Sequence, residues 1–273
     1  MQYIELIIEA CSSENKEILF ALLPEYGFDA IEELETSINA YAEHGTVDLE
    51  EVKCLLKKMD LKYRHEILQE RNWNADWESN FNPVIIPGKV LVRADFHPSQ
   101  AGFEHELVIT PKMSFGTGHH ATTKMMMEAM LEMDFKNKRV LDFGTGTGIL
   151  AILAEKLGAA EVIAIDNDPW SYENAMENIK ANQTTHVQVK IGDQIQGLGQ
   201  FDIVLANINK NILIQYAPVL KKIFVETADL IISGLLSDDY EEICLAYNPI
   251  IGENIKRFEH AGWIALAFKK ASN

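Results

Sequence analysis

The stretch that decides the fold of this 273-residue chain is Val140-Leu141-Asp142-Phe143-Gly144-Thr145-Gly146-Thr147-Gly148. It begins with the apolar character of a buried strand, and its glycines precede an apolar run that opens a helix. Glycine lets the backbone turn tightly and approach a ligand closely. In an open α/β sheet the ligand crevice lies at the carboxyl ends of the strands. We therefore predict a ligand-binding loop here, with Gly144 and Gly146 as candidate contacts.

Strands and helices alternate along the chain around this glycine loop. Strand-like runs fall at 107–112, 139–143, 161–166, 186–191, 201–206 and 228–233. Helical segments lie between them, at about 121–133, 148–158, 169–182 and 210–224. This alternation predicts a parallel sheet with helices on both faces. After a helix near 238–246, strand-like runs at 253–259 and 263–269 flank Gly262, which predicts an antiparallel hairpin at the end of the sheet.

The first quarter of the chain has a different order of elements. Strand-like runs lie at 2–9, 28–35, 37–43 and 62–69, and helical segments at 13–23 and 48–59. The order βαββαβ predicts a small ferredoxin-like α+β domain over residues 1–70. This segment holds 16 Asp+Glu against 6 Lys+Arg, so it supplies −10 of the net charge of −17.

A short aromatic segment follows this domain. Trp73, Trp77 and Phe81 are spaced four residues apart, which places them on one side of a helix. We predict a linker helix over 71–82 that packs its aromatic stripe on a catalytic domain at 83–273.

Composition narrows the class of protein. A net charge of −17 argues against direct nucleic-acid binding, and it suits a basic protein partner or simply solubility. No apolar run approaches the roughly 20 residues of a membrane span, and no leader is evident, so we expect a cytoplasmic protein without membrane contact. Cys11, Cys54 and Cys244 have neither metal nor disulfide-framework spacing. We expect them to be partly buried, reduced thiols.

The spacing of the glycines discriminates between two nucleotide cofactors. A dinucleotide loop has the pattern G-x-G-x-x-G/A, whereas Gly148 makes the pattern here G-x-G-x-G, with Ile149 at the dinucleotide position. Asp142 beside the loop would repel a pyrophosphate and attract the cationic methionine end of S-adenosyl-L-methionine (AdoMet). The alternative is that Asp142 only caps the loop. The pattern favours AdoMet over a nicotinamide dinucleotide.

Acidic residues follow the next two strands. Asp166 lies 22 residues after Gly144, at the distance where a carboxylate accepts hydrogen bonds from ribose hydroxyls. Asp168, followed by a proline, is expected to be the N-cap of the next helix. Asp193, after the third strand, is either a contact for the adenine amino group or a solvated turn residue.

The fourth strand ends at Asn207. In amine methyltransferases an Asn or Asp at this position faces the transferring methyl group, where its oxygen accepts a hydrogen bond from the amine and aims the lone pair. Asn207 is therefore the candidate catalytic residue, with a turn or cap role as the alternative. The following Ile208-Asn209 departs from the Pro-Pro-aromatic form of that motif.

A second glycine-containing loop precedes the first helix of the large domain. It reads Ser114-Phe115-Gly116-Thr117-Gly118-His119-His120-Ala121-Thr122-Thr123. Sequence neighbours rarely chelate one metal together, so we expect no metal at His119 and His120. The following Met125, Met126 and Met127 are expected to fill the core.

These motifs, taken together and in this order, resemble the bacterial ribosomal protein L11 methyltransferase family (PrmA). The resemblance covers nearly the whole chain, and its most specific part is the Phe115–Thr123 loop. It implies a Rossmann-like class I methyltransferase domain, with a mostly parallel sheet and an antiparallel C-terminal hairpin. It also implies AdoMet contacts at Thr123, Gly144, Asp166 and Asn207.

The resemblance further implies a substrate and a division of labour. The N-terminal domain would bind the ribosomal protein, and the catalytic domain would methylate its N-terminal α-amine and lysine side chains. Two alternatives stay open: AdoMet-dependent methylation of another protein's lysine or of a small molecule, and a non-catalytic AdoMet-binding module.

Overall fold

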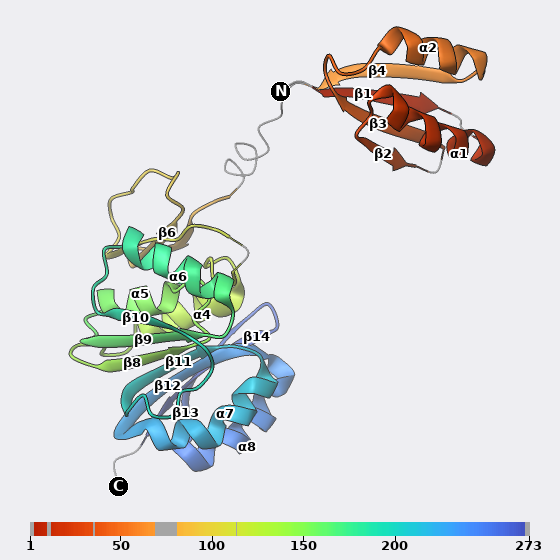
Figure 1. The fold of residues 1–273 in the computed structure, drawn as a ribbon. Helices are drawn as coiled ribbons and strands as arrows, with labels where there is room; N and C mark the ends of the chain where they lie inside the picture. Colours follow the sequence, from red (N-terminus) through yellow and green to blue (C-terminus); the bar gives the residue numbers. More distant parts are fainter. Residues whose placement is uncertain (1–2, 10–11, 35, 69–80, 113, 271–273) are drawn as a thin grey trace. The chain divides into compact units, whose positions relative to one another are not determined.

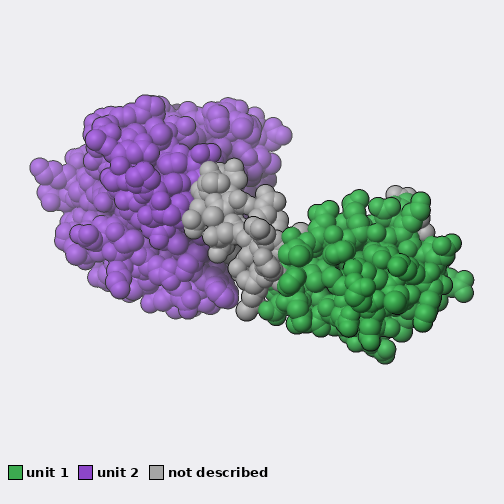
Figure 2. Space-filling model, turned by 90° about the horizontal axis from the view of Figure 1, so that it is seen from above, with its two compact units in different colours: residues 1–80 green, residues 81–273 purple. Residues whose placement is uncertain are grey.

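The structure, a computed structural model, describes residues 3–9, 12–34, 36–68, 81–112 and 114–270 (Figure 1). The chain divides into two compact units, residues 1–80 and 81–273 (Figure 2). The division falls inside the predicted linker helix, of which residues 71–80, with Trp73 and Trp77, lie outside the described residues. No helix in the described ranges is long and apolar enough to cross a membrane.

The first unit is an antiparallel sheet packed on two helices. Its elements are β1 (Tyr3–Glu9), α1 (Ser13–Leu22), a 3₁₀ turn η1 (Leu23–Tyr26), β2 (Ala30–Glu33), β3 (Ser37–Glu43), α2 (Leu49–Lys58) and β4 (Lys62–Leu68). The strand order β2-β3-β1-β4 confirms the predicted ferredoxin-like arrangement. Alternate residues of β1, including Leu6 and Ile8, pack with Leu19 of α1 and Leu56 of α2, so both helices cover one face.

The second unit is built on a seven-stranded sheet. Its strands are β8 (Arg139–Phe143), β9 (Glu161–Asp166), β10 (Val187–Ile191), β11 (Phe201–Asn207), β12 (Phe224–Leu236), β13 (Asn254–His260) and β14 (Trp263–Lys269). The order is β10-β9-β8-β11-β12-β14-β13, in which the first five strands are parallel and β14 is antiparallel to both of its neighbours. Ala261 and Gly262, both with positive φ, form the two-residue turn of the predicted hairpin.

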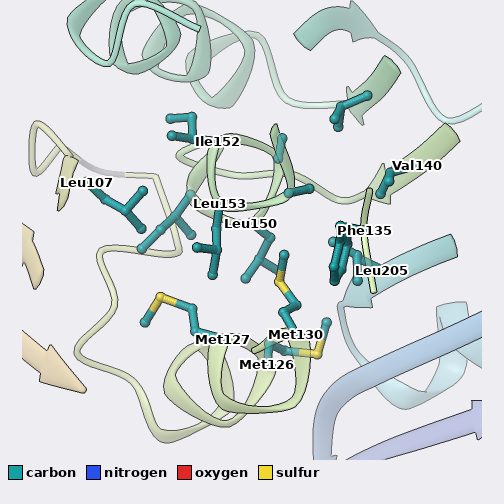
Figure 3. Close-up of a cluster of buried hydrophobic side chains, with 14 of the residues drawn as sticks. Leu107, Met126, Met127, Met130, Phe135, Val140, Leu150, Ile152, Leu153 and Leu205 are labelled. Carbon is teal, nitrogen blue, oxygen red and sulfur yellow. The ribbon is translucent and has the colours of Figure 1, made fainter. Parts of the chain in front are cut away.

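Helices cover both faces of this sheet, as Figure 1 shows. They are α4 (Ala121–Met130), α5 (Ile149–Lys156), α6 (Pro169–Ala181), α7 (Lys210–Ile223) and, after a 3₁₀ turn η2 (Ser237–Asp239), α8 (Tyr240–Ile251). Alternate side chains of β8 face opposite cores: Val140 packs with α4 and α5, and Leu141 packs with α7 and α8. The methionines of α4 are buried, as predicted, and Figure 3 shows Met126 and Met127 of the first core beside Leu150 and Leu153 of α5.

Two predictions need correction. The run at 107–112 is not a strand of the parallel sheet, because β7 (His105–Val108) belongs to a separate three-stranded sheet with β5 (Val84–Ile86) and β6 (Val90–Arg93). Beyond β7, the backbone N–H of Thr110 pairs with a side chain of α6 instead of a neighbouring strand. Cys54 is exposed instead of partly buried, since it lies on the outer side of α2. Cys11 lies outside the described residues.

Candidate functional site

A cleft lies at the carboxyl ends of β8, β9 and β11, as the sheet topology predicts. It consists of two cavities that share Gly144, Asp166, Asn167, Ile208 and Ile212. The Tyr216 cavity, of about 160 Å³, is closed by Asp193, Gln215 and Tyr216. The Asn207 cavity, of about 310 Å³, is lined by Phe115, Thr123, Gly146 and Asn207. All five predicted site residues, Thr123, Gly144, Gly146, Asp166 and Asn207, therefore line one cleft.

The glycine loop has the conformation and the close contacts that only glycine allows. Gly144 and Gly146 have φ values of +76° and +56°. A Cβ on Gly144 would lie 2.2 Å from Cγ2 of Ile208, and one on Gly146 would lie 2.3 Å from the carbonyl oxygen of Phe115. The glycines are thus required by neighbouring loops, and the same absence of side chains leaves the loop backbone open to a ligand.

Asp166 is anchored at the centre of the cleft. Its Oδ2 accepts a hydrogen bond from the backbone N–H of Gly146 at 2.8 Å, and its Oδ1 accepts one from the N–H of Asp168 at 3.0 Å. A carboxylate oxygen has two acceptor positions, so Asp166 can still accept from ribose hydroxyls. Asp168 is the N-cap of α6, as predicted, because its Oδ2 accepts from the N–H and the hydroxyl of Ser171. These bonds hold the pKa of Asp168 below its usual value.

Asn207 presents a buried acceptor beside the cleft. Its Nδ2 donates to the Oγ1 of Thr123 at 3.3 Å, and Thr123 is fully buried in the first turn of α4. Its Oδ1 is buried and has no hydrogen-bond partner among the described residues. The alternative cap role falls to Asn209, whose Oδ1 accepts from the N–H of Ile212 at the start of α7. Asn207 is therefore oriented by Thr123, and its buried oxygen is left without a partner among the described residues, which is unusual for a buried polar atom.

Asp142 lies behind the cleft. Its side chain is fully buried and lines neither cavity, and its Oδ2 accepts from Oγ1 of Thr145 at 2.5 Å. Burial raises its pKa to about 7, and the charge of Asp166 adds to the shift, whereas the Thr145 hydrogen bond opposes it. This geometry fits the alternative role of holding the glycine loop, because the strand alternation turns the carboxylate into the protein.

The cleft also contains residues that no sequence motif indicated. Ile212 and Tyr216 lie four residues apart on one side of α7, and Gln215 lies beside them. Burial, then the hydrogen bond and charge of Asp193, raise the pKa of the Tyr216 hydroxyl. Asp193 is exposed at the cavity wall, so both of its predicted roles remain compatible with its position. The spacing of Ile212 and Tyr216 was the available signal, but it fits an ordinary apolar helix face equally well.

The histidine pair has structural contacts. The Nδ1 of His120 accepts from the N–H of Thr122 and caps α4. His119 bonds through Nε2 to the carbonyl oxygen of Asn82 at 2.8 Å, and its ring lies 4.5 Å from the ring of Phe81. Phe81, the last aromatic residue of the predicted stripe, thus packs within the second unit. Residues 81 and 82 are not helical, so the predicted linker helix does not extend to residue 82.

The charge of the cleft discriminates between the candidate cofactors. Asp166 and Asp193 are acidic, and no Lys or Arg stands among the described residues that line either cavity. A pyrophosphate would lie here without a counter-charge, whereas a sulfonium and an ammonium group would be favoured. Asn207, whose buried Oδ1 lacks a hydrogen-bond partner among the described residues, lines the Asn207 cavity as well. The residues present therefore fit AdoMet better than a dinucleotide.

The chain resembles known proteins in sequence and in structure. It matches the family described as "Ribosomal protein L11 methyltransferase (PrmA)" over residues 7–271. It is 42% identical to the ribosomal protein L11 methyltransferase of Porphyromonas gingivalis over 261 residues, which cover 92% of this chain and 90% of that protein. It is 34% identical to the protein of the same name from Phocaeicola vulgatus over 278 residues, 98% of this chain and 99% of that protein.

Among solved structures, it superposes on the ribosomal protein L11 methylase of Lactobacillus delbrueckii subsp. bulgaricus with a TM-score of 0.64 at 27% identity, covering 70% of this chain and 99% of that chain. The family match over residues 7–271 extends over both compact units.

Proposed function

The chain belongs to the ribosomal protein L11 methyltransferase family, and on this premise we propose that it methylates amines of ribosomal protein L11. It is an AdoMet-dependent methyltransferase, and the proposed targets are the N-terminal α-amine and lysine side chains of that protein. The observation that carries the proposal is the buried, unpartnered Oδ1 of Asn207 beside an acidic cleft. We propose a cytoplasmic location, since the substrate is a ribosomal protein.

We propose that the cleft holds the cofactor along its length. Asp166, which lines both cavities, would accept hydrogen bonds from the ribose hydroxyls. The Tyr216 cavity would take the adenine, with Asp193 as acceptor for its amino group. The Asn207 cavity would take the methionine end, where Thr123 and the backbone of Gly144 and Gly146 form the wall.

The chemistry follows from what these residues can do. When bound, AdoMet supplies a methyl group on a sulfonium, and transfer forms an N–C bond while the S–C bond breaks. Asn207 Oδ1 would accept an N–H of the incoming amine and so point the nitrogen lone pair at the methyl carbon. The proton left on the methylated nitrogen passes to solvent.

The amine must be neutral to react. A free α-amine has a pKa of about 8, so a useful fraction is neutral near pH 7.5, whereas a lysine at about 10.4 is mostly charged. The apolar side chains of Phe115 and Ile208 in the Asn207 cavity would oppose the attraction of Asp166 for a charged lysine and so favour its neutral form. We propose that the site works by positioning and desolvation, without a dedicated general base.

The N-terminal unit is the proposed substrate-recognition domain. Residues 1–70 carry −10 of the net charge, which suits a basic protein partner. The second unit has its own two-sided core. Removal of residues 1–80 should therefore abolish methylation of the folded protein and spare methylation of a short peptide amine. Equal loss of both activities would contradict this division of labour.

The decisive experiment is incubation of the full-length protein and labelled AdoMet with a bacterial lysate that lacks this activity. Label in ribosomal protein L11 alone, at its α-amine and lysines, is the expected result. Label on a lysine of a different protein would support the alternative substrate. Cofactor binding without any labelled product would support a non-catalytic AdoMet-binding module.

A further inference from the structure

Helix α6 holds the segment after β7 with a row of asparagines. Asn174, Asn178 and Asn182 are spaced four residues apart and lie on one side of the helix. Asn182 accepts from the N–H of Val108 at 2.9 Å and donates to its carbonyl oxygen at 2.6 Å. Asn178 accepts from the N–H of Thr110 at 2.9 Å, and Asn174 donates to the carbonyl oxygen of Thr110 at 3.3 Å. The amides thus replace a neighbouring strand along the segment that leads into the 114–120 loop.

Asn178 has a second contact that its neighbours in this row do not show. It is fully buried, and its Nδ2 donates to the carbonyl oxygen of Thr147 in the glycine loop at 2.8 Å. Thr147, also fully buried, donates its N–H to the carbonyl oxygen of Phe115 at 3.0 Å and its Oγ1 hydroxyl to that of Gly116 at 2.6 Å. One amide therefore binds both Thr110, in the segment before the 114–120 loop, and the glycine loop on which that loop rests.

The glycine loop and the 114–120 loop are in close contact. The hydrogen bonds from Asn178 to Thr147, and from Thr147 to the 114–120 loop, can therefore affect the cavity. A Cβ on Gly116 would lie 2.9 Å from Oγ1 of Thr147, and one on Gly146 would lie 2.3 Å from the carbonyl oxygen of Phe115. Phe115, Gly116 and Gly146 line the Asn207 cavity, whereas Thr147 and Asn178 do not. A displacement at Thr147 would therefore reach the cavity through the residues that form its wall.

We propose that Thr147 and Asn178 are positioning residues that seat the 114–120 loop on the glycine loop and so form the cofactor-binding wall of the Asn207 cavity. This inference rests on the proposed function, because it takes AdoMet as the occupant of that cavity. Neither residue touches the cofactor or the substrate. Both act through Phe115 and Gly116.

The test measures binding of S-adenosyl-L-homocysteine, the demethylated product, by calorimetry. Thr147→Val keeps the side-chain shape and removes the hydroxyl that donates to Gly116, so we expect the Kd to rise about tenfold. Thr147→Ser restores the hydroxyl and should bring the Kd back to within about threefold of the wild type. At saturating AdoMet, kcat of the Val variant should fall by less than about threefold while KM for AdoMet rises about tenfold.

A matched pair separates this role from general stability. Asn178→Asp keeps an acceptor for Thr110 but loses the donor to Thr147, and it should weaken binding about tenfold. Asn182→Asp loses the equivalent donors one turn further along α6, away from the glycine loop. It should lower Tm by a similar amount and change the Kd by less than about twofold.

The outcomes are distinguishable from failure of the proposed function. If the wild-type protein itself produces no heat with S-adenosyl-L-homocysteine, the cofactor assignment is wrong. If the wild type binds and Thr147→Val binds equally well, the hydrogen bonds of Thr147 do not position the 114–120 loop. Equal weakening by Asn178→Asp and Asn182→Asp would also overturn the inference, because the effect would then follow stability alone.

Discussion

The amino ends and the carboxyl ends of the strands in the seven-stranded sheet differ in how their polar residues are paired. At the amino end of β8, Arg139 donates through Nε to Glu161 at 2.6 Å and through Nη1 to the carbonyl oxygen of Gln200 at 2.9 Å, and its guanidinium lies 4.4 Å from the ring centre of Phe201. Its backbone N–H donates to Asp202. The polar groups around Arg139 are therefore paired with one another, whereas Asp229 at the amino end of β12 has a buried Oδ1 without a partner among the described residues.

At the carboxyl ends of the strands, some buried polar groups are not fully paired. Asn207 ends β11 with a buried oxygen that no described residue satisfies. Asp142, three residues after Arg139 on the same strand, is buried with its pKa raised to about 7. Unpaired buried groups reduce stability. The contrast indicates that the polar contacts around Arg139 stabilise the fold, whereas the carboxyl ends of β8 and β11 give up stability beside the cleft.

The largest expected effect is that of Asn207→Ala on methyl transfer. Loss of the amide oxygen removes the group that aims the amine, so kcat for a peptide amine should fall by about 10²-fold or more, as for other preorganised donors and acceptors. Asn207→Asp keeps an oxygen and should fall less. Single-turnover rates with bound labelled AdoMet measure the effect. A rate within about twofold of the wild type would show that this end of the sheet holds no aiming group.

The next effect concerns the carboxylate at the centre of the cleft. Asp166→Ala strands the N–H groups of Gly146 and Asp168 and removes the ribose acceptor. Binding of S-adenosyl-L-homocysteine should weaken by about 1–3 kcal/mol. Asp168→Ala is the control, since it removes the α6 cap and should lower Tm with little change in affinity. Calorimetry giving the same loss for both variants would mean that Asp166 acts only through α6.

A smaller effect is the pH dependence introduced by Asp142. Its pKa is about 7 in the folded chain and about 3.9 when unfolded, so the folded state binds the extra proton between these values. This contribution to stability is therefore fully present below about pH 4 and is lost as the pH rises to about 7. Asp142→Asn should raise the free energy of unfolding at pH 8 by about 1–2 kcal/mol and flatten this dependence.

Urea titrations at pH 5, 6, 7 and 8 measure the change. If the free energy of unfolding depends on pH in the same way for the wild type and for Asp142→Asn, burial of the Asp142 carboxylate does not reduce stability.

The smallest expected effect concerns the paired polar groups around Arg139. Arg139→Met keeps the aliphatic packing on Phe201 and removes the ion pair with Glu161. The side chains of Arg139 and Glu161 are 29% and 38% exposed. Solvent screens such a pair, so the free energy of unfolding should fall by about 1 kcal/mol or less, with kcat unchanged. A loss of activity approaching that of Asn207→Ala would break the distinction between the two ends.

Local patterns predicted the parts of the fold whose causes are local. The strands 139–143 and 161–166 were predicted to the residue, because Val/Ile-rich runs end there at glycine or aspartate. The cap at Asp168 followed from the proline after it. Asn207 was identified from its place at a strand end, and Thr123 from the family resemblance, whereas the hydrogen bond between them was not predicted.

Other features depend on partners far away in the chain. The segment at 107–112 has the composition of a strand, but only its first two residues pair with a strand, β6, and the N–H groups of Val108 and Thr110 donate to amides of α6 about 70 residues later. Gln215 and Tyr216 line the cleft only because of the rotation of α7 about its axis, which its apolar stripe does not fix. The burial of Asp142 depends likewise on what packs behind the glycine loop.

The insertion of β14 between β12 and β13 has a consequence for biosynthesis. β12 finds its second neighbour, and β13 joins the sheet, only through residues 263–269. While the ribosome still encloses that segment, the nascent chain exposes an unpaired apolar edge along Leu230–Ile232. Until residues 263–269 emerge, this edge is open to pairing with other strands, and a chaperone that shields it would be useful.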